Sequence, residues 1–297
     1  MARHEPVLTR EVLAFLAPER GGLFVDCTVG AGGHSLALLE AGATRLIGLD
    51  RDPAAIAIAA ETLDAFRDRA DLVQADFREL DAVLDARGIG TIDGALADLG
   101  VSSMRLDAPG RGFSFQRDEA LDMRMDTTSP GTLADLIRDV SETHLADVIH
   151  RYGEERHARR IARAIVRARE RASIRSTGQL ADLIRRSIPR HARRRPRIDP
   201  ATRTFQALRI WVNEELAGLD DFLLRLLQRL ATGARAVVIA FHSLEDRIVK
   251  HTFRALEQAA DLQARLLTRK PVVPSAEEIA RNPRARSAKL RAIERLA

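Results

Sequence analysis

The sequence predicts an α/β protein in which a parallel sheet is interrupted by an all-helical insertion. The first hundred residues alternate between strand-like and helix-like patterns, which is typical of a parallel sheet covered by helices. Between about Met104 and Pro200 the strand-like patterns vanish, and afterwards the α/β pattern returns. Because neither half alone has enough strands to close a core, we expect one discontinuous Rossmann-like domain, residues 1–104 and 201–297, with an inserted helical domain, residues 105–200.

The expected strands are short apolar runs that end in polar or glycine-containing turns. In the first half they cover residues 23–29, 45–50, 71–76 and 92–98, and helices follow near Ser35, Pro53 and Phe77. In the insertion, Thr132, Ser141 and Ser176 are residue types that begin helices. After the insertion we expect an amphipathic helix over 204–230, a buried strand over 236–241, a helix from Leu244 and an edge strand over 287–293.

The composition is that of a globular protein: 297 residues with 45% hydrophobic content can bury a sizeable core. No run of eighteen apolar residues occurs, and the first residues lack the apolar segment of a signal peptide. We therefore expect a cytoplasmic protein with no membrane segment. Cys27 is the only cysteine, which excludes an internal disulfide, and we expect it to be a small buried strand residue.

Positive charge is concentrated in one part of the insertion. Residues 151–200 hold sixteen arginines against five acidic residues, a formal charge of +11 in a chain whose total is +5. A local basic surface of this kind is typical of proteins that bind a nucleic-acid phosphate backbone. The alternative is a solvated helix face with no such partner.

A glycine-rich turn follows the first expected strand and indicates a nucleoside cofactor. The run 24–29 leads directly into Gly30-Ala31-Gly32-Gly33-His34-Ser35, and glycines there let a ligand approach the backbone. The next strand ends at Asp50, where an acid would reach ribose hydroxyls. The third glycine of the dinucleotide motif is missing, and an extra acid, Asp26, precedes the turn. S-adenosylmethionine is therefore favoured over a nicotinamide dinucleotide or a turn without a ligand.

Two further strand ends carry candidate site residues, because ligands of open α/β sheets bind at the carboxyl ends of the strands. Phe77 follows the third strand and is suited to an adenine face, with a core role as the alternative. Asp98 ends the fourth strand before Gly100, Ser102 and Ser103, and it is the leading catalytic candidate. A carboxylate there could accept a hydrogen of an exocyclic amine and favour that nitrogen as the nucleophile. A buried helix cap is the alternative for Asp98.

Two other stretches are polar or aromatic enough to be considered for substrate binding. His242 and Ser243 follow a buried strand and should face the same edge of the sheet, although capping by Ser243 explains them equally well. Phe113 and Phe115, interleaved with Arg111 and Gly112, suit stacking on an unpaired base, and loop packing is the alternative. His4 and His34 share no ligand spacing with a carboxylate or a cysteine, so no metal is assigned.

Taken in order, these motifs resemble the bacterial 16S ribosomal RNA cytosine-N4 methyltransferases over essentially the whole chain. The resemblance rests on His4 with Pro6-Val7-Leu8 and on residues 30–35, 49–53, 98–103, 111–115, 121–126, 152–156, 201–207, 241–247 and 282–287. It implies a class I S-adenosylmethionine-dependent methyltransferase that methylates the N4 atom of a cytidine in the decoding region, the P site, of 16S ribosomal RNA within the small ribosomal subunit. A homodimer is expected only by weak analogy.

The resemblance also implies roles for individual residues. Donor contacts are expected from Gly32, Gly33 and His34. Asp50 is expected on the ribose, Phe77 near the adenine and Asp98 close to the methyl group. Arg105 is also expected to contact the donor, although the family commonly has Gln at this position. Substrate contacts are expected from Ser102, Ser103, Phe113, Phe115 and His242. Methylation of DNA or of a protein on the same fold, and a non-catalytic RNA-binding factor, remain the alternatives.

Overall fold

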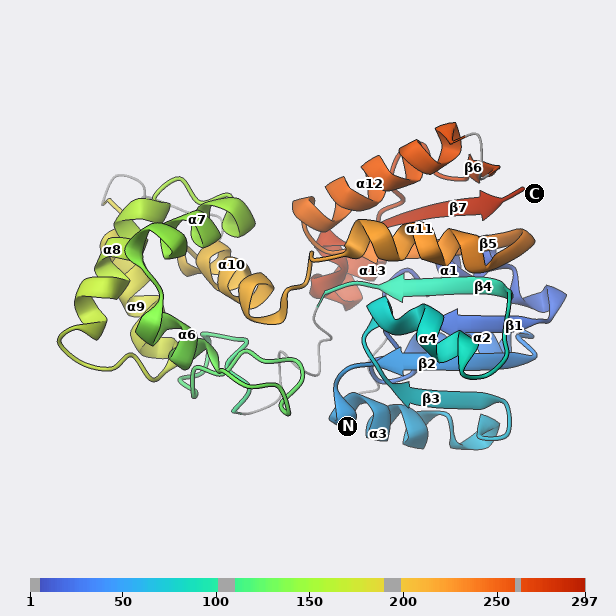
Figure 1. The fold of residues 1–297 in the computed structure, drawn as a ribbon, viewed down its shortest axis with the longest axis horizontal. Helices are drawn as coiled ribbons and strands as arrows, with labels where there is room; N and C mark the ends of the chain where they lie inside the picture. Colours follow the sequence, from blue (N-terminus) through green and yellow to red (C-terminus); the bar gives the residue numbers. More distant parts are fainter. Residues whose placement is uncertain (1–5, 101–109, 190–198, 260–262, 297) are drawn as a thin grey trace. The chain divides into compact units, whose positions relative to one another are not determined.

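The computed structural model describes residues 6–100, 110–189, 199–259 and 263–296 (Figure 1). The chain divides into two compact units, Met1–Ser102 with Leu216–Ala297, and Ser103–Glu215. We call them the sheet unit and the helical unit. The break after Glu215 does not coincide with the expected one after residue 200, because the helix that begins at Ala201 packs within the helical unit.

The sheet unit is built on seven strands in the order β3-β2-β1-β4-β5-β7-β6. Neighbouring strands from β3 to β5 run parallel, whereas β7 is antiparallel to both β5 and β6. The bounds are β1 Leu23–Asp26, β2 Arg45–Asp50, β3 Ala70–Gln74, β4 Ile92–Asp98, β5 Leu230–Ala240, β6 Ala264–Leu266 and β7 Lys289–Arg295. The four strands expected in the first half are therefore confirmed. The C-terminal strand, expected at an edge, lies instead between β5 and β6.

Helices cover both faces of this sheet (Figure 1). Successive residues of a strand point to opposite faces, so Phe24 packs into one core and Val25 into the other. The first core contains apolar residues of α1 and α2, and the second those of α4, α11 and α12. The helix bounds are α1 Thr9–Leu16, α2 Gly33–Glu40, α3 Pro53–Thr62, α4 Leu80–Asp85, α11 Leu219–Arg229, α12 Ser243–Gln258 and α13 Ala276–Arg281, with short 3₁₀ helices η1 Pro18–Arg20, η2 Asp64–Phe66, η3 Phe77–Glu79 and η5 Pro283–Ser287.

The helical unit contains α6 Leu133–Asp139, α7 Glu142–Gly153, α8 Ala158–Arg169, α9 Thr177–Ser187 and α10 Ala201–Asn213. The expected starts are confirmed, because Thr132, Ser141 and Ser176 each accept a backbone N–H of the first turn with their side chains. α7 packs against both α8 and α10. The buried Asn213 side chain fixes the preceding loop by accepting the N–H of Met125 and donating to the carbonyl of Met123.

The single helix expected over 204–230 is wrong. α10 ends at Asn213 and α11 begins at Leu219, and the residues that flank this break, Glu214 and Gly218, have φ values of 49° and 66°. Left-handed residues end a helix, and the apolar periodicity continues across them because each helix packs into its own core. Among the described residues, no helix has the length and apolar character needed to cross a membrane.

Candidate active site

The site lies at the carboxyl ends of β1, β2 and β4, where the structure brings together most of the residues expected on the sheet unit. These strands are adjacent and parallel, so their ends meet at one edge of the sheet. The turn after β1 supplies the glycines and the first turn of α2. The end of β2 supplies Asp50, and the end of β4 supplies Asp98.

The glycine turn adopts conformations that favour glycine. Gly30 has φ 53°, and Gly32, the residue that precedes α2, has φ 82°. A Cβ atom on Gly33 would lie 3.2 Å from Pro6 Cγ, which is tighter than an ordinary contact. The N-cap residue of α2 is Gly32, which has no side chain to accept an N–H of the first turn as a Ser, Asp or Thr would.

Asp50 ties this turn to the neighbouring strand. Its Oδ2 atom accepts the N–H of Gly30 at 3.1 Å, and its Oδ1 atom accepts the N–H of Asp52 at 2.9 Å. Asp52 in turn caps α3 by accepting the N–H of Ala54. The carboxylate of Asp50 therefore lies directly beside the turn, where the sequence predicts a ribose contact.

Asp26 is a buried acid beneath the turn, with an exposed fraction of only 1%. Its Oδ2 atom accepts the hydroxyl of Ser35 at 2.7 Å, and its Oδ1 atom accepts the N–H of Thr28 at 3.2 Å. Burial raises the pKa of Asp26 from 3.8 to about 6, and the hydrogen bond from Ser35 is the largest opposing effect. Asp26 therefore titrates within reach of physiological pH while holding both ends of the turn.

Asp98 and His34 meet above this buried acid. Asp98 Oδ2 lies 3.6 Å from His34 Nε2, and the side chain of Asp98 is 25% exposed whereas that of His34 is 6% exposed. Among the described residues, Asp98 Oδ1 and both ring nitrogens of His34 are buried without a hydrogen-bond partner. Three unsatisfied buried atoms so close together indicate a place where a bound molecule supplies the missing partners.

Phe77 begins η3 just after β3. Its ring lies 4.7 Å from that of Phe222, and it packs half-buried against the core shared by α4 and α11. Asp76 caps η3 and forms a bidentate ion pair with Arg78, so this acid already has partners. Phe77 thus fills the structural role that the sequence left as its alternative, while one part of the ring stays accessible.

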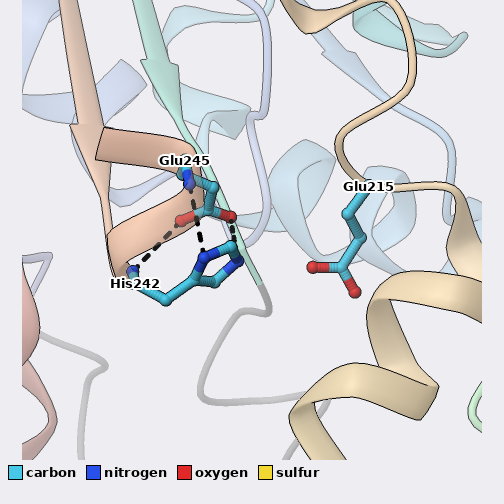
Figure 2. A group of neighbouring side chains, drawn as sticks. All are labelled: Glu215, His242 and Glu245. Carbon is cyan, nitrogen blue, oxygen red and sulfur yellow. Dashed lines mark hydrogen bonds and ion pairs between the residues drawn. The ribbon is translucent and has the colours of Figure 1, made fainter. Parts of the chain in front are cut away.

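His242 lies at the end of β5 and acts as the cap of α12 (Figure 2). Its Nδ1 atom accepts the N–H of Glu245 at 3.3 Å, and Glu245 Oε2 accepts the N–H of His242 at 3.3 Å. This reciprocal pair is a capping box. The sequence expected the cap at Ser243, which is instead the first residue of α12. Glu215, also drawn in Figure 2, is ion-paired with Arg209 within the helical unit.

Phe113 and Phe115 belong to the helical unit, and both rings pack there. Phe113 is only 7% exposed, with the guanidinium of Arg111 5.9 Å from its ring centre. Phe115 packs edge-on against Phe205 at 4.8 Å. Loop packing, the alternative given to these rings by the sequence, is therefore their observed role. His4, Ser102, Ser103 and Arg105 lie outside the described residues.

Two site residues were missed by the sequence reasoning. The hydroxyl of Thr28 accepts the N–H of Asp98 at 2.6 Å, and Ser35 donates to Asp26. Both are small hydroxyl residues beside a glycine turn, which is also a common pattern in turns that bind nothing. Only the pairing of β1 with β4 makes Thr28 a neighbour of Asp98, and this pairing joins residues far apart in sequence.

These residues fit S-adenosylmethionine. The turn offers backbone without Cβ atoms at Gly30 and Gly32, the acid at Asp50 borders it, and the unsatisfied atoms of His34 and Asp98 face the same end of the sheet. No phosphate needs to be neutralised, and no cationic side chain is found among Gly30, Gly32, His34, Asp50 and Asp98 unless His34 is protonated. A sulfonium donor is therefore compatible with an edge that carries two carboxylates.

Comparison with known proteins gives the family. The model of the MraW methylase family matches residues 1–296. Ribosomal RNA small subunit methyltransferase H of Anaeromyxobacter dehalogenans is 52% identical, covering 99% of this chain and 98% of the relative. The protein of the same name from Geobacter sulfurreducens is 51% identical, covering 99% of each.

Among solved structures, an rRNA methylase from Streptococcus thermophilus aligns with a TM-score of 0.44 at 11% identity, covering 100% of both chains. A SAM-dependent O-methyltransferase from Thermotoga maritima aligns with a TM-score of 0.45 at 8% identity, covering 100% of this chain and 69% of the other. The match of the family model to nearly the whole chain and the close relatives decide the assignment. The chain belongs to the MraW methylase family, with a Rossmann-like α/β methyltransferase fold and S-adenosylmethionine as its cofactor.

Proposed function

We propose that this protein methylates the N4 atom of one cytidine in the decoding region, the P site, of 16S ribosomal RNA, with S-adenosylmethionine as the methyl donor. The broader activity, methylation of small-subunit ribosomal RNA, follows from the family and from relatives of that name at about half identity over nearly the full length. The cytosine-N4 position is the finer part of the proposal and depends on the chemistry of Asp98.

The unsatisfied Oδ1 atom of Asp98 is the observation that carries the proposal. Among the described residues this oxygen has no hydrogen-bond partner, although the side chain is a quarter exposed and its backbone is fixed by Thr28. An exocyclic amino group of a base is a donor of two hydrogens, and it is a weak nucleophile because its lone pair is delocalised into the ring. A carboxylate that accepts one of these hydrogens localises the lone pair and favours the amino nitrogen over the ring atoms.

S-adenosylmethionine, when bound, supplies a methyl group on a sulfonium sulfur, which is a good leaving group. The protein therefore has to orient the acceptor nitrogen in line with that methyl group, which is a task of positioning. In the transfer a C–N bond forms from the lone pair of the amine and the C–S bond breaks, leaving the nitrogen cationic. The product nitrogen is strongly acidic, so its extra proton can pass to a carboxylate, and Asp98 is placed to take or relay it.

The donor is held by the residues at the same edge. The backbone of Gly32 and Gly33 borders it, His34 contributes a ring nitrogen, and Asp50 accepts from the ribose hydroxyls. Phe77 offers the accessible part of its ring to the adenine. Arg105 remains in the proposal from the sequence alone, because it lies outside the described residues.

The RNA is held by the helical unit, and α8 is the element best suited to it. Arg159, Arg160 and Arg167 are exposed on α8 and have no ion pair among the described residues, while the opposite face of α8 is buried through Ile161 and Ile165. Other arginines of the same basic segment have structural roles. Arg185 is paired with Asp199, and Arg169 donates to two backbone carbonyls. Unpaired arginines on one helix face are the electrostatic footprint expected for a phosphate backbone.

The test is competition between substrates. Labelled methyl transfer from S-adenosylmethionine is measured with small ribosomal subunits that lack the modification, with naked 16S ribosomal RNA, with single-stranded DNA and with total protein. The proposal expects transfer to the ribosomal substrates only. Preferred transfer to DNA or protein would show that the proposed RNA substrate is wrong. Tight donor binding without transfer to any substrate would favour a non-catalytic RNA-binding factor. Homodimerisation, the cytoplasmic location and the absence of a metal remain predictions.

A further inference from the structure

A pocket opens on the sheet unit beside the cap of α12. It has a volume of about 230 Å³ and lies between the end of β5 with the start of α12 on one side and the junction of η5 with β7 on the other. The lining residues that matter here are Phe241, His242, Ser243, Arg286, Ser287 and Lys289. Its volume is smaller than that of a typical cofactor site, and it suits one small planar or anionic group.

The pocket adjoins the proposed methyl-transfer site. A Cβ atom on Gly100, two residues after Asp98, would lie 3.4 Å from the ring of Phe241. β4 and β5 are parallel neighbours, and Asp98 is paired with Ile239. A molecule in the pocket at the end of β5 would therefore lie one strand away from the base held by Asp98 at the end of β4. This is the separation expected for the nucleotide next to the target base.

The charges of the pocket favour an anion. Arg286 is exposed and makes no ion pair or hydrogen bond through its side chain among the described residues. Lys289 is half-buried and lies 3.1 Å from Asp246, so it is less available. The pocket is also lined by His242 and Ser243 at the N-terminus of α12, a helix of sixteen residues, whose dipole adds partial positive charge to that of Arg286. The acids of its first turn, Glu245 and Asp246, offset part of this charge, so Arg286 is the principal anion-binding group.

The other walls favour a base or sugar beside that anion. Phe241 is half-buried, so part of its ring is accessible, and the nearby Val273 is 59% exposed, which is unusual for a valine of this chain. The side chain of His242 is 7% exposed, and its Nε2 atom, 3.1 Å from Glu245 Oε1, makes no hydrogen bond of acceptable geometry within the described structure. Hydroxyl groups of Ser243 and Ser287 complete the polar lining.

We propose that this pocket binds one nucleotide of the RNA substrate next to the target base, with its phosphate on Arg286 and the start of α12 and its base or sugar against Phe241. The inference rests on the proposed RNA substrate. It is favoured over a peptide ligand because the combination of an unpaired arginine, a helix N-terminus and an accessible aromatic ring matches single-stranded nucleic acid. Holding the neighbouring nucleotide would keep the target base extruded toward Asp98.

The test uses Arg286→Ala, Arg286→Lys and the control Arg254→Ala in the full-length protein. Arg254 is an exposed arginine of α12, about 16 Å along the helix from its first residue, and its side chain has no ion pair or hydrogen bond among the described residues. Its removal changes the net charge equally. Dissociation constants are measured by fluorescence anisotropy at several salt concentrations with a labelled single-stranded RNA that carries the target region. Affinity for S-adenosylhomocysteine is measured in parallel.

We expect Arg286→Ala to raise the dissociation constant for the RNA about three- to tenfold. The salt slope, which is the steepness with which the logarithm of the binding constant falls with the logarithm of the salt concentration, should decrease by about 0.7, the value for one lost phosphate contact of a single strand. Arg286→Lys should keep the slope, Arg254→Ala should change neither quantity, and all variants should keep affinity for S-adenosylhomocysteine. Equal effects of Arg286→Ala and Arg254→Ala on the dissociation constant and on the salt dependence would overturn the proposal. Because binding is measured without methyl transfer, failure of the pocket and failure of the proposed activity are distinguishable.

Discussion

His34 Nε2 lies 3.6 Å from Asp98 Oδ2, although the two residues come from different elements, the first turn of α2 and the end of β4. Hydrogen bonds hold both partners of this contact in place. Thr28 accepts the N–H of Asp98, and Asp26 accepts the hydroxyl of Ser35, which lies on the same turn of α2 as His34. One oxygen of Asp98 thus faces His34, and the other has no hydrogen-bond partner among the described residues. We propose that this second oxygen accepts a hydrogen bond from the substrate amine.

Asp98→Asn should abolish most of the methyl transfer while leaving the fold and donor binding intact. The amide keeps the size of the side chain and the backbone contact to Thr28, but it loses the charge that accepts the amine hydrogen. We expect kcat to fall by about 10²- to 10⁴-fold, the usual contribution of a positioned acid or base. Single-turnover kinetics give the rate, and calorimetry with S-adenosylhomocysteine gives the affinity.

The control for this change is Asp93→Asn, at the other end of the same strand, where the carboxylate accepts the N–H of Leu23. It should leave kcat unchanged. Full activity of Asp98→Asn would remove Asp98 from its proposed role.

Gly32→Ala should weaken donor binding beyond its cost to stability. Gly32 has φ 82°, so an alanine there costs about 1–2 kcal/mol for a left-handed conformation and would shift the turn backbone that borders the donor. Its Cβ atom would lie 3.4 Å from atoms of Ala59, Thr62 and Leu63, which is an ordinary contact. Gly88→Ala is a matched control, because Gly88 has φ 66° and its added Cβ would meet nothing within 4 Å. Denaturant unfolding should show comparable losses for both variants, whereas calorimetry should show lost donor affinity for Gly32→Ala alone. Equal donor affinities would contradict a donor site at this turn.

The buried acid Asp26 should make the stability depend on pH. Its pKa is about 6 in the folded protein and 3.8 ordinarily, so between these values the folded state holds the proton more tightly than the unfolded state. The stability that this proton provides is present below pH 4 and is lost as the pH rises through 6. Relative to Asp26→Asn, the wild type should lose about 3 kcal/mol of unfolding free energy over that range. A difference between the two proteins that does not change from pH 4 to pH 7 would be incompatible with the raised pKa.

His242 should behave as a helix cap. His242→Ala removes the acceptor of the Glu245 N–H and should destabilise the protein by about 1 kcal/mol. His242→Asn restores a capping side chain and should recover most of that loss. Thermal unfolding compares the three proteins, and the KM for the RNA substrate tests the additional substrate role expected from the sequence. If that role exists, KM should rise in both variants despite the recovered stability of His242→Asn.

Arg167→Ala should weaken RNA binding, and Arg138→Ala should not. Both residues are exposed arginines of the helical unit, but Arg167 is without an ion pair among the described residues, whereas Arg138 is paired with Asp135 and Asp139. Loss of a phosphate contact through Arg167 should lower the salt slope by somewhat less than one. The slope comes from filter binding of 16S ribosomal RNA at several salt concentrations. The same slope for both variants would show that net charge alone, and not α8, governs binding.

The fold of the sheet unit could be read from the sequence because its signals are local. The runs that became β2 and β4 have their expected bounds, since buried parallel strands are continuous apolar segments between turns. The break between α10 and α11 could not be read, because apolar periodicity continues through Glu214 and Gly218 while each helix packs in a different unit. The inner place of β7 depends on pairing with β5 and β6, which no local pattern encodes.

The positions of the candidate site residues were predictable where a residue type is required by backbone geometry or by its place at a strand end. Gly32, Asp50 and Asp98 belong to this group, and the structure brings them to one edge of the sheet. Roles that depend on tertiary neighbours could not be predicted from the sequence. The cap made by His242, the packing of Phe113 and the support of Asp98 by Thr28 all depend on contacts that the spacing of the residues does not reveal.

The most direct test of the account is the identity of the methylated nucleoside. Small ribosomal subunits that lack the modification are incubated with the wild-type protein and labelled S-adenosylmethionine, and the RNA is digested to nucleosides and analysed by chromatography and mass spectrometry against synthetic standards. The account predicts N4-methylcytidine at a single site, with none produced by Asp98→Asn. Methylation at N3 or C5 of cytosine, or on another base, would contradict the proposal that Asp98 directs the methyl group to the exocyclic nitrogen.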